Sequence, residues 1–109
     1  ADRVNMAFGT DILMNPVGTA SQGRQLAKLT RFMAPLEALR MATGAAGELL
    51  ALSGARAPYD GRLGVIAEGA LADLLVVEGD PAAGLDWLDD PAANLTLILK
   101  GGVLVKDAL

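Results

Sequence analysis

The 109-residue chain contains no histidine and no cysteine. Without cysteine, the chain can form neither a disulfide framework nor a thiolate metal site. Without histidine as well, its ligands are carboxylate and carbonyl oxygens, which favour hard ions and bind zinc weakly. We therefore expect no metal cofactor to be bound by this chain alone.

Aromatic residues make up only 4% of the chain, although 52% of its residues are apolar. Alanine, leucine and valine must supply the packing, which favours helices on short apolar strands over an aromatic-rich β-sandwich. The formal charge of −4 argues against nucleic acid as a partner, because phosphate neutralisation needs a basic patch. Arg24, Lys28 and Arg31 share one helical face, and we expect that face to be a solvated surface.

Long apolar runs are also missing. None approaches the roughly 20 residues of a membrane-spanning helix, and no signal-peptide pattern is present. We therefore expect a cytoplasmic location and no membrane partner. The length allows one domain at most, and the chain begins at Ala1 within a predicted strand, which indicates an excised or truncated segment.

The first half of the sequence predicts one strand followed by helices. The run Val4–Thr10 has strand length, and Asp11 opens a loop that contains Asn15-Pro16 and Gly18. Three helices are then expected: residues 21 to about 33 with Ser21 as N-cap, a second with Pro35 in its first turn, and Ala45–Leu52, after an interruption at Gly44.

The second half predicts strands. Leu63–Ile66 can form a short strand, and Ala72–Val77 is nearly continuous in apolar residues, as in a strand covered on both faces. Residues 79–94 form a loop. Leu95–Leu99 and Val103–Val105 flank Lys100-Gly101-Gly102, which is a strong β-hairpin signal.

Asp11 is the first candidate for a functional residue. A carboxylate just beyond the end of a buried strand, followed by a loop and a helix, is where βα-barrel enzymes keep catalytic groups. Such an aspartate also commonly caps a turn by accepting a backbone N–H bond. From the pattern alone, both interpretations stay open and turn capping is favoured.

Other candidates favour structural roles. We expect Asp73 to accept N–H bonds from the Glu68–Ala70 turn, because an unpaired buried carboxylate is unfavourable. Trp87 is expected to anchor the 79–94 loop on the core. The acidic residues of that loop lack the ligand spacing of an EF-hand and predict a solvated loop; they are Asp80, Asp86, Asp89 and Asp90.

Four ordered motifs resemble the amidohydrolase superfamily of metal-dependent hydrolases. Phe8-Gly9-Thr10-Asp11 is similar to the end of the eighth barrel strand, and residues 35–43 and 45–50 to the following helices of imidazolonepropionase-like and Xaa-Pro dipeptidase-like members. Residues 64–81 and 97–103 resemble strands returning to a small β-sandwich domain. The resemblance implies an α/β fold: the last strand–helix unit of a (β/α)₈ barrel with linking helices, residues 1–54, and C-terminal β-sandwich strands, residues 55–109.

The resemblance also implies a chemistry. In such enzymes one or two divalent metals, typically zinc, activate a water that attacks the substrate, and the strand-eight aspartate touches the metal and carries the proton. Asp11 is the one residue to which this catalytic and metal-binding role transfers. Ala34 departs from the Ser or Thr that often caps the next helix. The loop Ile12–Gly23, expected to line the substrate pocket, matches no family signature.

The expected function is therefore hydrolysis of a C–N bond, in a cyclic amide, imide or dipeptide, by an enzyme of which this chain alone is inactive. The expected partners are a small-molecule substrate, the remainder of the barrel and further copies of the chain. Self-association is expected because the strand Val4–Thr10 and the apolar stripe of Leu26, Leu29 and Phe32 lack neighbours within the sequence. The alternative is a non-catalytic structural or interaction module.

Overall fold

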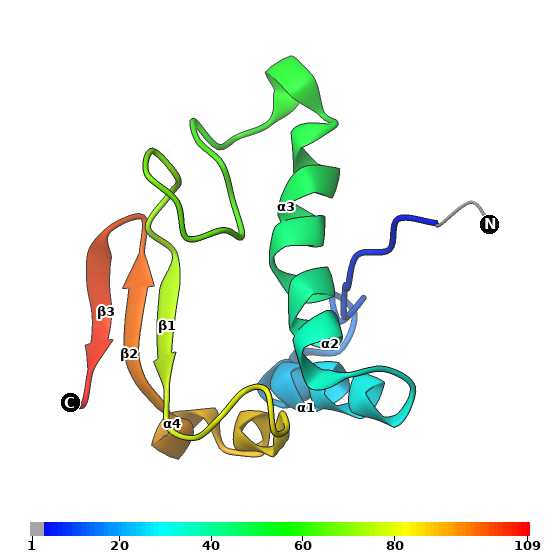
Figure 1. The fold of residues 1–109 in the computed structure, drawn as a ribbon, viewed down its shortest axis with the longest axis vertical. Coiled ribbons are helices and arrows are strands. Elements are labelled where there is room, and N and C mark those ends of the chain that lie inside the picture. The colour runs from blue at the N-terminus through cyan, green and yellow to red at the C-terminus, as the bar shows by residue number, and fades with distance from the viewer. Residues whose placement is uncertain (1–3) are drawn as a thin grey trace.

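The computed structural model describes residues 4–109 as a set of helices followed by an antiparallel sheet (Figure 1). Its helices are α1 (Gln22–Ala27), α2 (Pro35–Ala42), α3 (Gly44–Ala51) and α4 (Pro91–Asn94). Four 3₁₀ segments accompany them: η1 (Pro16–Ser21), η2 (Lys28–Arg31), η3 (Gly54–Arg56) and η4 (Asp86–Asp89). The strands are β1 (Leu74–Val77), β2 (Leu95–Lys100) and β3 (Val103–Asp107).

The predicted helix over residues 21–33 is broken into three shorter pieces. Only α1 is α-helical, and 3₁₀ turns precede and follow it. Ser21 does not cap α1 as predicted, because its hydroxyl donates to the carbonyl of Gly18 at 2.8 Å. Thr30 likewise donates to the carbonyl of Ala27 at 2.7 Å, a local bond that competes with regular helix geometry.

The next two helices follow the prediction closely. Pro35 begins α2, where its missing N–H is no loss and its fixed φ is already helical. The break between α2 and α3 falls at Thr43, with φ −118° and ψ −93°, so Gly44 begins α3 rather than interrupting the chain. Beyond α3, Gly54 adopts a positive φ of 54°, as glycine near a helix end commonly does.

The predicted hairpin is present. Strands β2 and β3 pair antiparallel through Gly101 and Gly102, whose φ values of 55° and 80° suit the turn that matches strand twist. On its other side β2 pairs antiparallel with β1, so the strand order is β1-β2-β3. Each pairing contains one register shift, at Val76/Val77 and at Ile98/Leu99.

Two predicted strands are absent. Residues 4–10 form no strand and are tied to the helices by one backbone bond, from Phe8 N to Met41 O at 3.0 Å. Residues 63–66 also form no strand; a single bridge joins Arg62 to Ala70 nearby. The N–H and C=O groups of a strand need a second strand as hydrogen-bond partner. Among the described residues, no strand lies beside these two segments.

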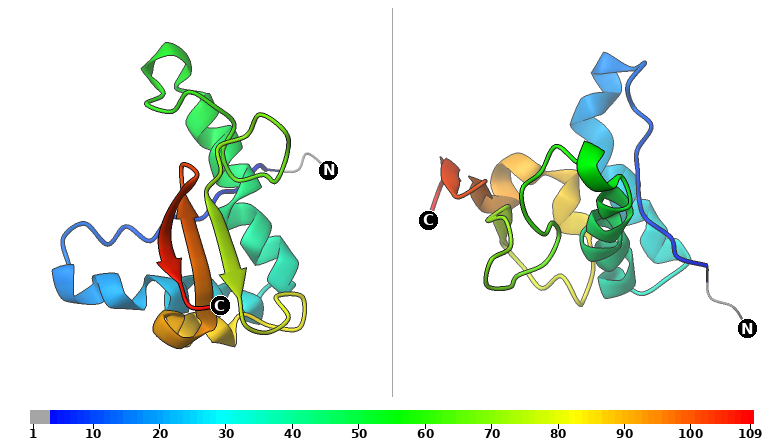
Figure 2. Two further views of the ribbon diagram at one scale, coloured as in Figure 1. Left: turned by 90° about the vertical axis from the view of Figure 1, so that its left-hand side faces the viewer. Right: turned by 90° about the horizontal axis from the view of Figure 1, so that it is seen from above.

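The sheet is joined to the helices by the segment that precedes β2. Before β2, the segment η4 lies beside α1, and α4 connects η4 to β2 (Figures 1 and 2). A Cβ on Gly23 of α1 would lie 2.7 Å from the carbonyl oxygen of Leu88, so the two backbones approach closely. Arg24 pairs with Asp89 at 3.1 Å across the same contact, and Leu85 is buried beside it.

The loop after α3 makes a second close contact with the helices. A Cβ on Gly47 would lie 2.3 Å from the carbonyl oxygen of Leu63. A Cβ on Gly64, whose φ is 72°, would lie 2.2 Å from that of Thr43. Only glycine leaves room for the loop to lie this close to α3.

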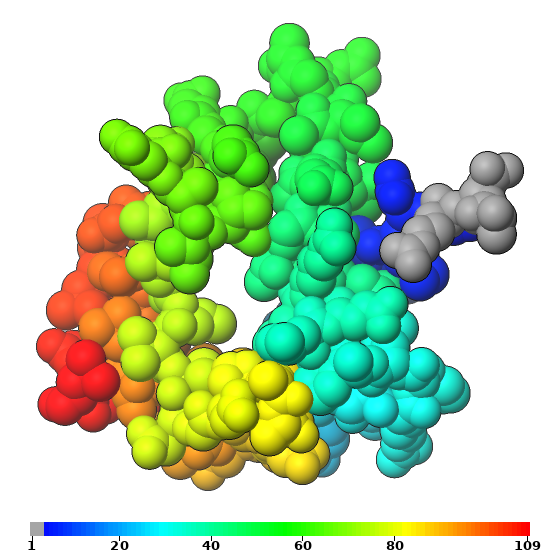
Figure 3. All heavy atoms as spheres, in the orientation of Figure 1, coloured from blue at the N-terminus to red at the C-terminus, as the bar shows by residue number. Residues whose placement is uncertain are grey.

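Little of the apolar surface is enclosed. Ala38 and Leu85 are the buried apolar residues of the described chain. The molecule exposes 8071 Å², whereas a folded monomer of this mass exposes about 5,700 Å². Figure 3 shows a hollow between β1 and α3. The elements therefore form an open arrangement whose apolar faces are only partly covered by the chain itself.

The contact at Gly47 yields a stability prediction. Gly47→Ala would place a methyl group against the Leu63 backbone and should lower the free energy of unfolding by about 1–3 kcal/mol, the usual effect of overpacking. That loss opposes the gain of roughly 1 kcal/mol that alanine normally brings to a helix. Urea unfolding followed by circular dichroism measures the net effect.

Gly84→Ala is the matched control, because a Cβ there meets only a carboxylate oxygen at 3.9 Å. It should change stability by no more than about 0.5 kcal/mol. A Gly47→Ala variant more stable than the parent chain would show that the loop does not rest against α3.

Candidate functional site

Asp11 lies at the start of the loop that leads to the helices. Its φ of 49° makes it the non-glycine residue with a left-handed backbone among residues 4–109. Aspartate tolerates this conformation better than most residues, and such positions concentrate at turns and functional sites. The side chain is exposed, and no described residue donates a hydrogen bond to its carboxylate, so the expected turn cap is not formed.

Two linked turns follow Asp11 and shape the loop. Asn15 N donates to the carbonyl of Ile12 at 3.0 Å, which closes the first turn. The side-chain oxygen of Asn15 then accepts from Gly18 N at 2.9 Å and caps η1, which has Pro16 as its first residue. A Cβ on Gly18 would lie 2.7 Å from the Asn15 amide nitrogen, so this turn too is closely packed.

A metal site is not formed by the described residues alone. No cluster of three or more carboxylate, imidazole or thiolate groups occurs among residues 4–109. Asp11 can supply one oxygen ligand, and a complete coordination shell requires groups beyond those described. The described residues therefore do not fit a resident metal by themselves.

All four acidic residues of the 79–94 loop are exposed, and two of them accept backbone hydrogen bonds. Asp80 accepts from Ala82 N at 2.9 Å, and Asp90 caps α4 by accepting from Ala93 N at 3.1 Å. Asp89 pairs with Arg24, as described above. These contacts agree with a solvated loop.

Trp87 anchors the loop less fully than predicted. Its ring is half-buried and its indole N–H donates to the carbonyl of Gly84 at 3.0 Å. The fully buried side chain of this loop is Leu85, which is 1% exposed. On α1 and η2, the predicted solvated face is exposed at Arg24, Lys28 and Arg31.

Asp73 accepts hydrogen bonds from the turn of the β2–β3 hairpin, so the hydrogen-bond donors predicted for it were wrong. The carboxylate accepts from Gly101 N at 2.6 Å and from the Lys100 ammonium at 2.5 Å, rather than from the 68–70 turn. Lys100 also lies over the Tyr59 ring, 5.8 Å from its centroid. Both donors lie more than 25 residues along the chain, so local turn chemistry could not identify them.

The hydrogen bond from Lys100, then the Gly101 N–H bond, and last the positive charge of Lys100 lower the pKa of Asp73. The same hydrogen bond raises the pKa of Lys100. Both directions mean that the folded state favours the charged pair.

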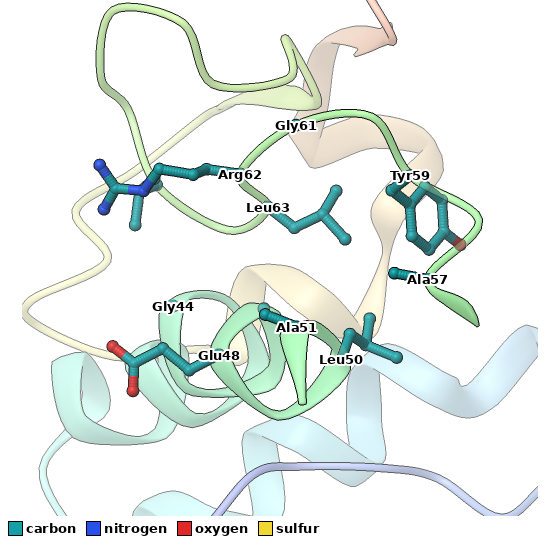
Figure 4. Close-up of a pocket in the computed structure, with 11 residues that line it drawn as sticks. Gly44, Glu48, Leu50, Ala51, Ala57, Tyr59, Gly61, Arg62 and Leu63 are labelled. Carbon is teal, nitrogen blue, oxygen red and sulfur yellow. The ribbon is translucent and has the colours of Figure 1, made fainter. Parts of the chain in front are cut away.

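A cavity of about 290 Å³ lies between α3 and the loop over residues 57–65 (Figure 4). Its floor is apolar, with Ala51 and Leu63 on opposite walls, while Glu48 and Arg62 extend at one side. These two charged groups form no ion pair with each other. Asp11 does not line this cavity, so the candidate carboxylate and the cavity are separate features.

The exposed carboxylate of Asp11 is followed by a loop, by helices and by a closing antiparallel sheet, which is a mixed α/β arrangement. Residues 1–105 match the model of the amidohydrolase family, and the chain belongs to that family. No helix of the described residues is long and apolar enough to cross a membrane. The comparison with curated proteins found no significant match.

Solved structures give more detailed likenesses. The crystal structure of an amidohydrolase is 32% identical, with a TM-score of 0.79 over 97% of this chain and 24% of that one. The crystal structure of a prolidase complexed with N-methylphosphonate-L-proline is 36% identical, with a TM-score of 0.76 over 95% of this chain and 23% of that one. The present chain thus spans about a quarter of the length of these relatives.

The hydrogen bonds that the Asp73 carboxylate accepts from Lys100 and Gly101 lead to a prediction about stability and pH. Because the folded-state pKa of Asp73 is lowered, its stabilisation is present above the ordinary value of 3.8 and is lost as the pH falls through the lowered value. Asp73→Asn should therefore reduce the urea midpoint at neutral pH, and the difference from the parent chain should shrink below pH 3.8.

Asp86→Asn serves as control, since Asp86 is exposed and accepts no hydrogen bond from the described residues. Its urea midpoint should follow that of the parent chain at every pH. A difference in urea midpoint between Asp73→Asn and the parent chain that stays constant down to about pH 2 would argue against an ionised Asp73 carboxylate in these hydrogen bonds.

Proposed function

We propose that this chain is part of a metal-dependent hydrolase that cleaves a C–N bond, in a cyclic amide, imide or dipeptide, and that Asp11 carries the proton in that reaction. Membership of the amidohydrolase family supports the reaction class. The single observation that supports the role of Asp11 is its exposed carboxylate, which accepts no hydrogen bond from residues 4–109, at a left-handed residue.

The proposed role of Asp11 is proton transfer, for which a carboxylate is suited. One Oδ atom would accept the proton of an attacking water and later deliver it to the leaving nitrogen, as a general base and then a general acid. When bound, one or two divalent ions, zinc in our proposal, would lower the pKa of that water and polarise the substrate. Asp11 would supply one ligand, and the remainder of the barrel would supply the others.

We further propose that residues 1–54 complete the barrel and that residues 55–109 contribute strands to a β-sandwich. The long helical half and the antiparallel sheet support this division. Among the substrate classes, the prolidase relative complexed with N-methylphosphonate-L-proline favours a dipeptide. The proposed partners are therefore a small dipeptide substrate and the remaining barrel.

Asp11→Asn tests the catalytic role. Asparagine also accepts a left-handed backbone, so the variant should fold normally while losing the basic oxygen. In the complete enzyme we expect turnover to fall by about 10²-fold or more, the usual contribution of a proton-transfer group. Steady-state kinetics on a dipeptide series with the added metal, alongside circular dichroism, make the measurement.

Asn15→Asp is a useful companion, because it keeps the oxygen that accepts from Gly18 N in the same loop. Its turnover should stay within a few-fold of the parent enzyme. A well-folded Asp11→Asn enzyme with near-normal turnover would remove Asp11 from the mechanism.

A second candidate is a non-catalytic interaction module, and the open sheet favours it. Leu75 and Val76 of β1 and Val103 to Val105 of β3 are exposed, and neighbouring residues of a strand point to opposite faces. Both faces of the sheet therefore present apolar side chains. Such a sheet can pair with further copies of the chain.

The isolated chain should accordingly self-associate at micromolar concentration, as measured by sedimentation velocity. Leu104→Lys on the outer strand β3 should shift the chain toward monomer, because a charge on an edge strand opposes pairing. Ala82→Lys, at an exposed position outside the sheet, should not. A parent chain that sediments as a monomer would contradict the module and the expected self-association.

A further inference from the structure

The cavity beside α3 has charged groups at one side and apolar groups at the other (Figure 4). Glu48 of α3 and Arg62 of the loop extend at the charged side, while Leu50 and Tyr59 lie at the far side. The volume of about 290 Å³ lies at the small end of the range for ligand pockets, which begins near roughly 300 Å³. The cavity therefore suits a molecule the size of one amino acid better than a peptide.

The two charged side chains at this cavity have no ion-pair partner among residues 4–109. The ion pairs of the described chain join other side chains, as given above. Most exposed charges are simply solvated, but Glu48 and Arg62 carry opposite signs and border an apolar space. A carboxylate can bind an ammonium group, and a guanidinium group can bind a carboxylate through two parallel hydrogen bonds.

The backbone that carries the two charged residues is held in place. The carbonyl of Arg62 accepts from Leu71 N at 2.9 Å. The next residue, Leu63, lies with its carbonyl against Gly47, which directly precedes Glu48 on α3. The close contact between the loop and the helix is thus formed by the immediate neighbours of Glu48 and Arg62.

The apolar side of the cavity is supported from the sheet. Lys100 of β2 lies over the Tyr59 ring, 5.8 Å from its centroid, and its ammonium group is paired with Asp73. A cation over an aromatic ring is attracted to the ring face, so this contact favours one position of Tyr59. Walls that are placed before a ligand arrives lower the entropy lost on binding.

We propose that this cavity binds a free α-amino acid with an apolar side chain. Glu48 binds its ammonium group, Arg62 binds its carboxylate, and its side chain lies toward Leu50 and Tyr59. The ligand class follows from the walls, which call for both charges on one small molecule with an apolar body. Asp11 does not line this cavity, so the site is separate from the proposed reaction and goes beyond it.

The test is calorimetric binding of related probes to the complete enzyme. L-Leucine carries both charges, L-leucinamide lacks the carboxylate, and 4-methylpentanoate lacks the ammonium group. We expect L-leucine to bind most tightly and each of the other two about 10-fold more weakly, because each loses a hydrogen bond between charged groups. Glycine, which lacks the apolar side chain, should also bind at least about 10-fold more weakly. This series tests the ligand class without any substitution.

Two variants then assign the charged contacts. Arg62→Gln should weaken L-leucine binding about 10-fold and leave L-leucinamide binding nearly unchanged. Glu48→Gln should weaken L-leucine binding to the same extent and leave 4-methylpentanoate binding nearly unchanged. Arg56→Gln and Glu68→Gln are matched controls, since both residues are exposed and neither lines the cavity. They should bind every probe as the parent enzyme does, and circular dichroism checks that each variant folds.

Three results would overturn this inference. A complete enzyme that does not bind L-leucine at millimolar concentration would mean that other parts of the protein fill the cavity. L-Leucine binding that neither variant changes would place the ligand elsewhere, the catalytic centre included. An Arg62→Gln enzyme that loses L-leucine and L-leucinamide equally would show that Arg62 supports the loop and does not bind a carboxylate. None of these measurements needs turnover, so the role of Asp11 is decided separately.

Discussion

Three glycines control how the sheet and the loops are held against the helices. Gly23 lets α1 approach the backbone at Leu88, while Gly47 and Gly64 let the loop after α3 lie against α3 and the preceding turn. At each position a Cβ would lie less than 3 Å from a backbone oxygen. Because the enclosed core is small, these backbone contacts, with the ion pair of Arg24 and Asp89, set the relative placement of the two halves.

The parts that the sequence predicts correctly are those with local causes. Pro35 sets the start of α2, and Gly101-Gly102 sets the hairpin, because the determining residues lie inside the element. Residues 4–10 have the composition of a strand, but no strand among the described residues pairs with them, and composition carries no information about a pairing partner. Asp73 illustrates the same limit, since its structural role was predictable but its donors at Lys100 and Gly101 were not.

The candidate site shows a similar division. Asp11 was identifiable from its position after an apolar run and from the family motif, whereas its left-handed backbone was not, because no local pattern required it. The loop after Asp11 contains Leu13, Met14 and Val17, and the sequence alone does not indicate whether these apolar residues are buried or exposed. The structure leaves all three side chains exposed within this chain.

The left-handed backbone of Asp11 also bears on how this position can change in evolution. Single-base changes of an aspartate codon include those that give asparagine and glycine, two residues that accept a positive φ. A lineage can therefore lose the carboxylate in one step without penalty to folding. If Asp11 carries the proton as proposed, active descendants should keep aspartate here, and asparagine or glycine would mark a descendant that kept the scaffold without the reaction.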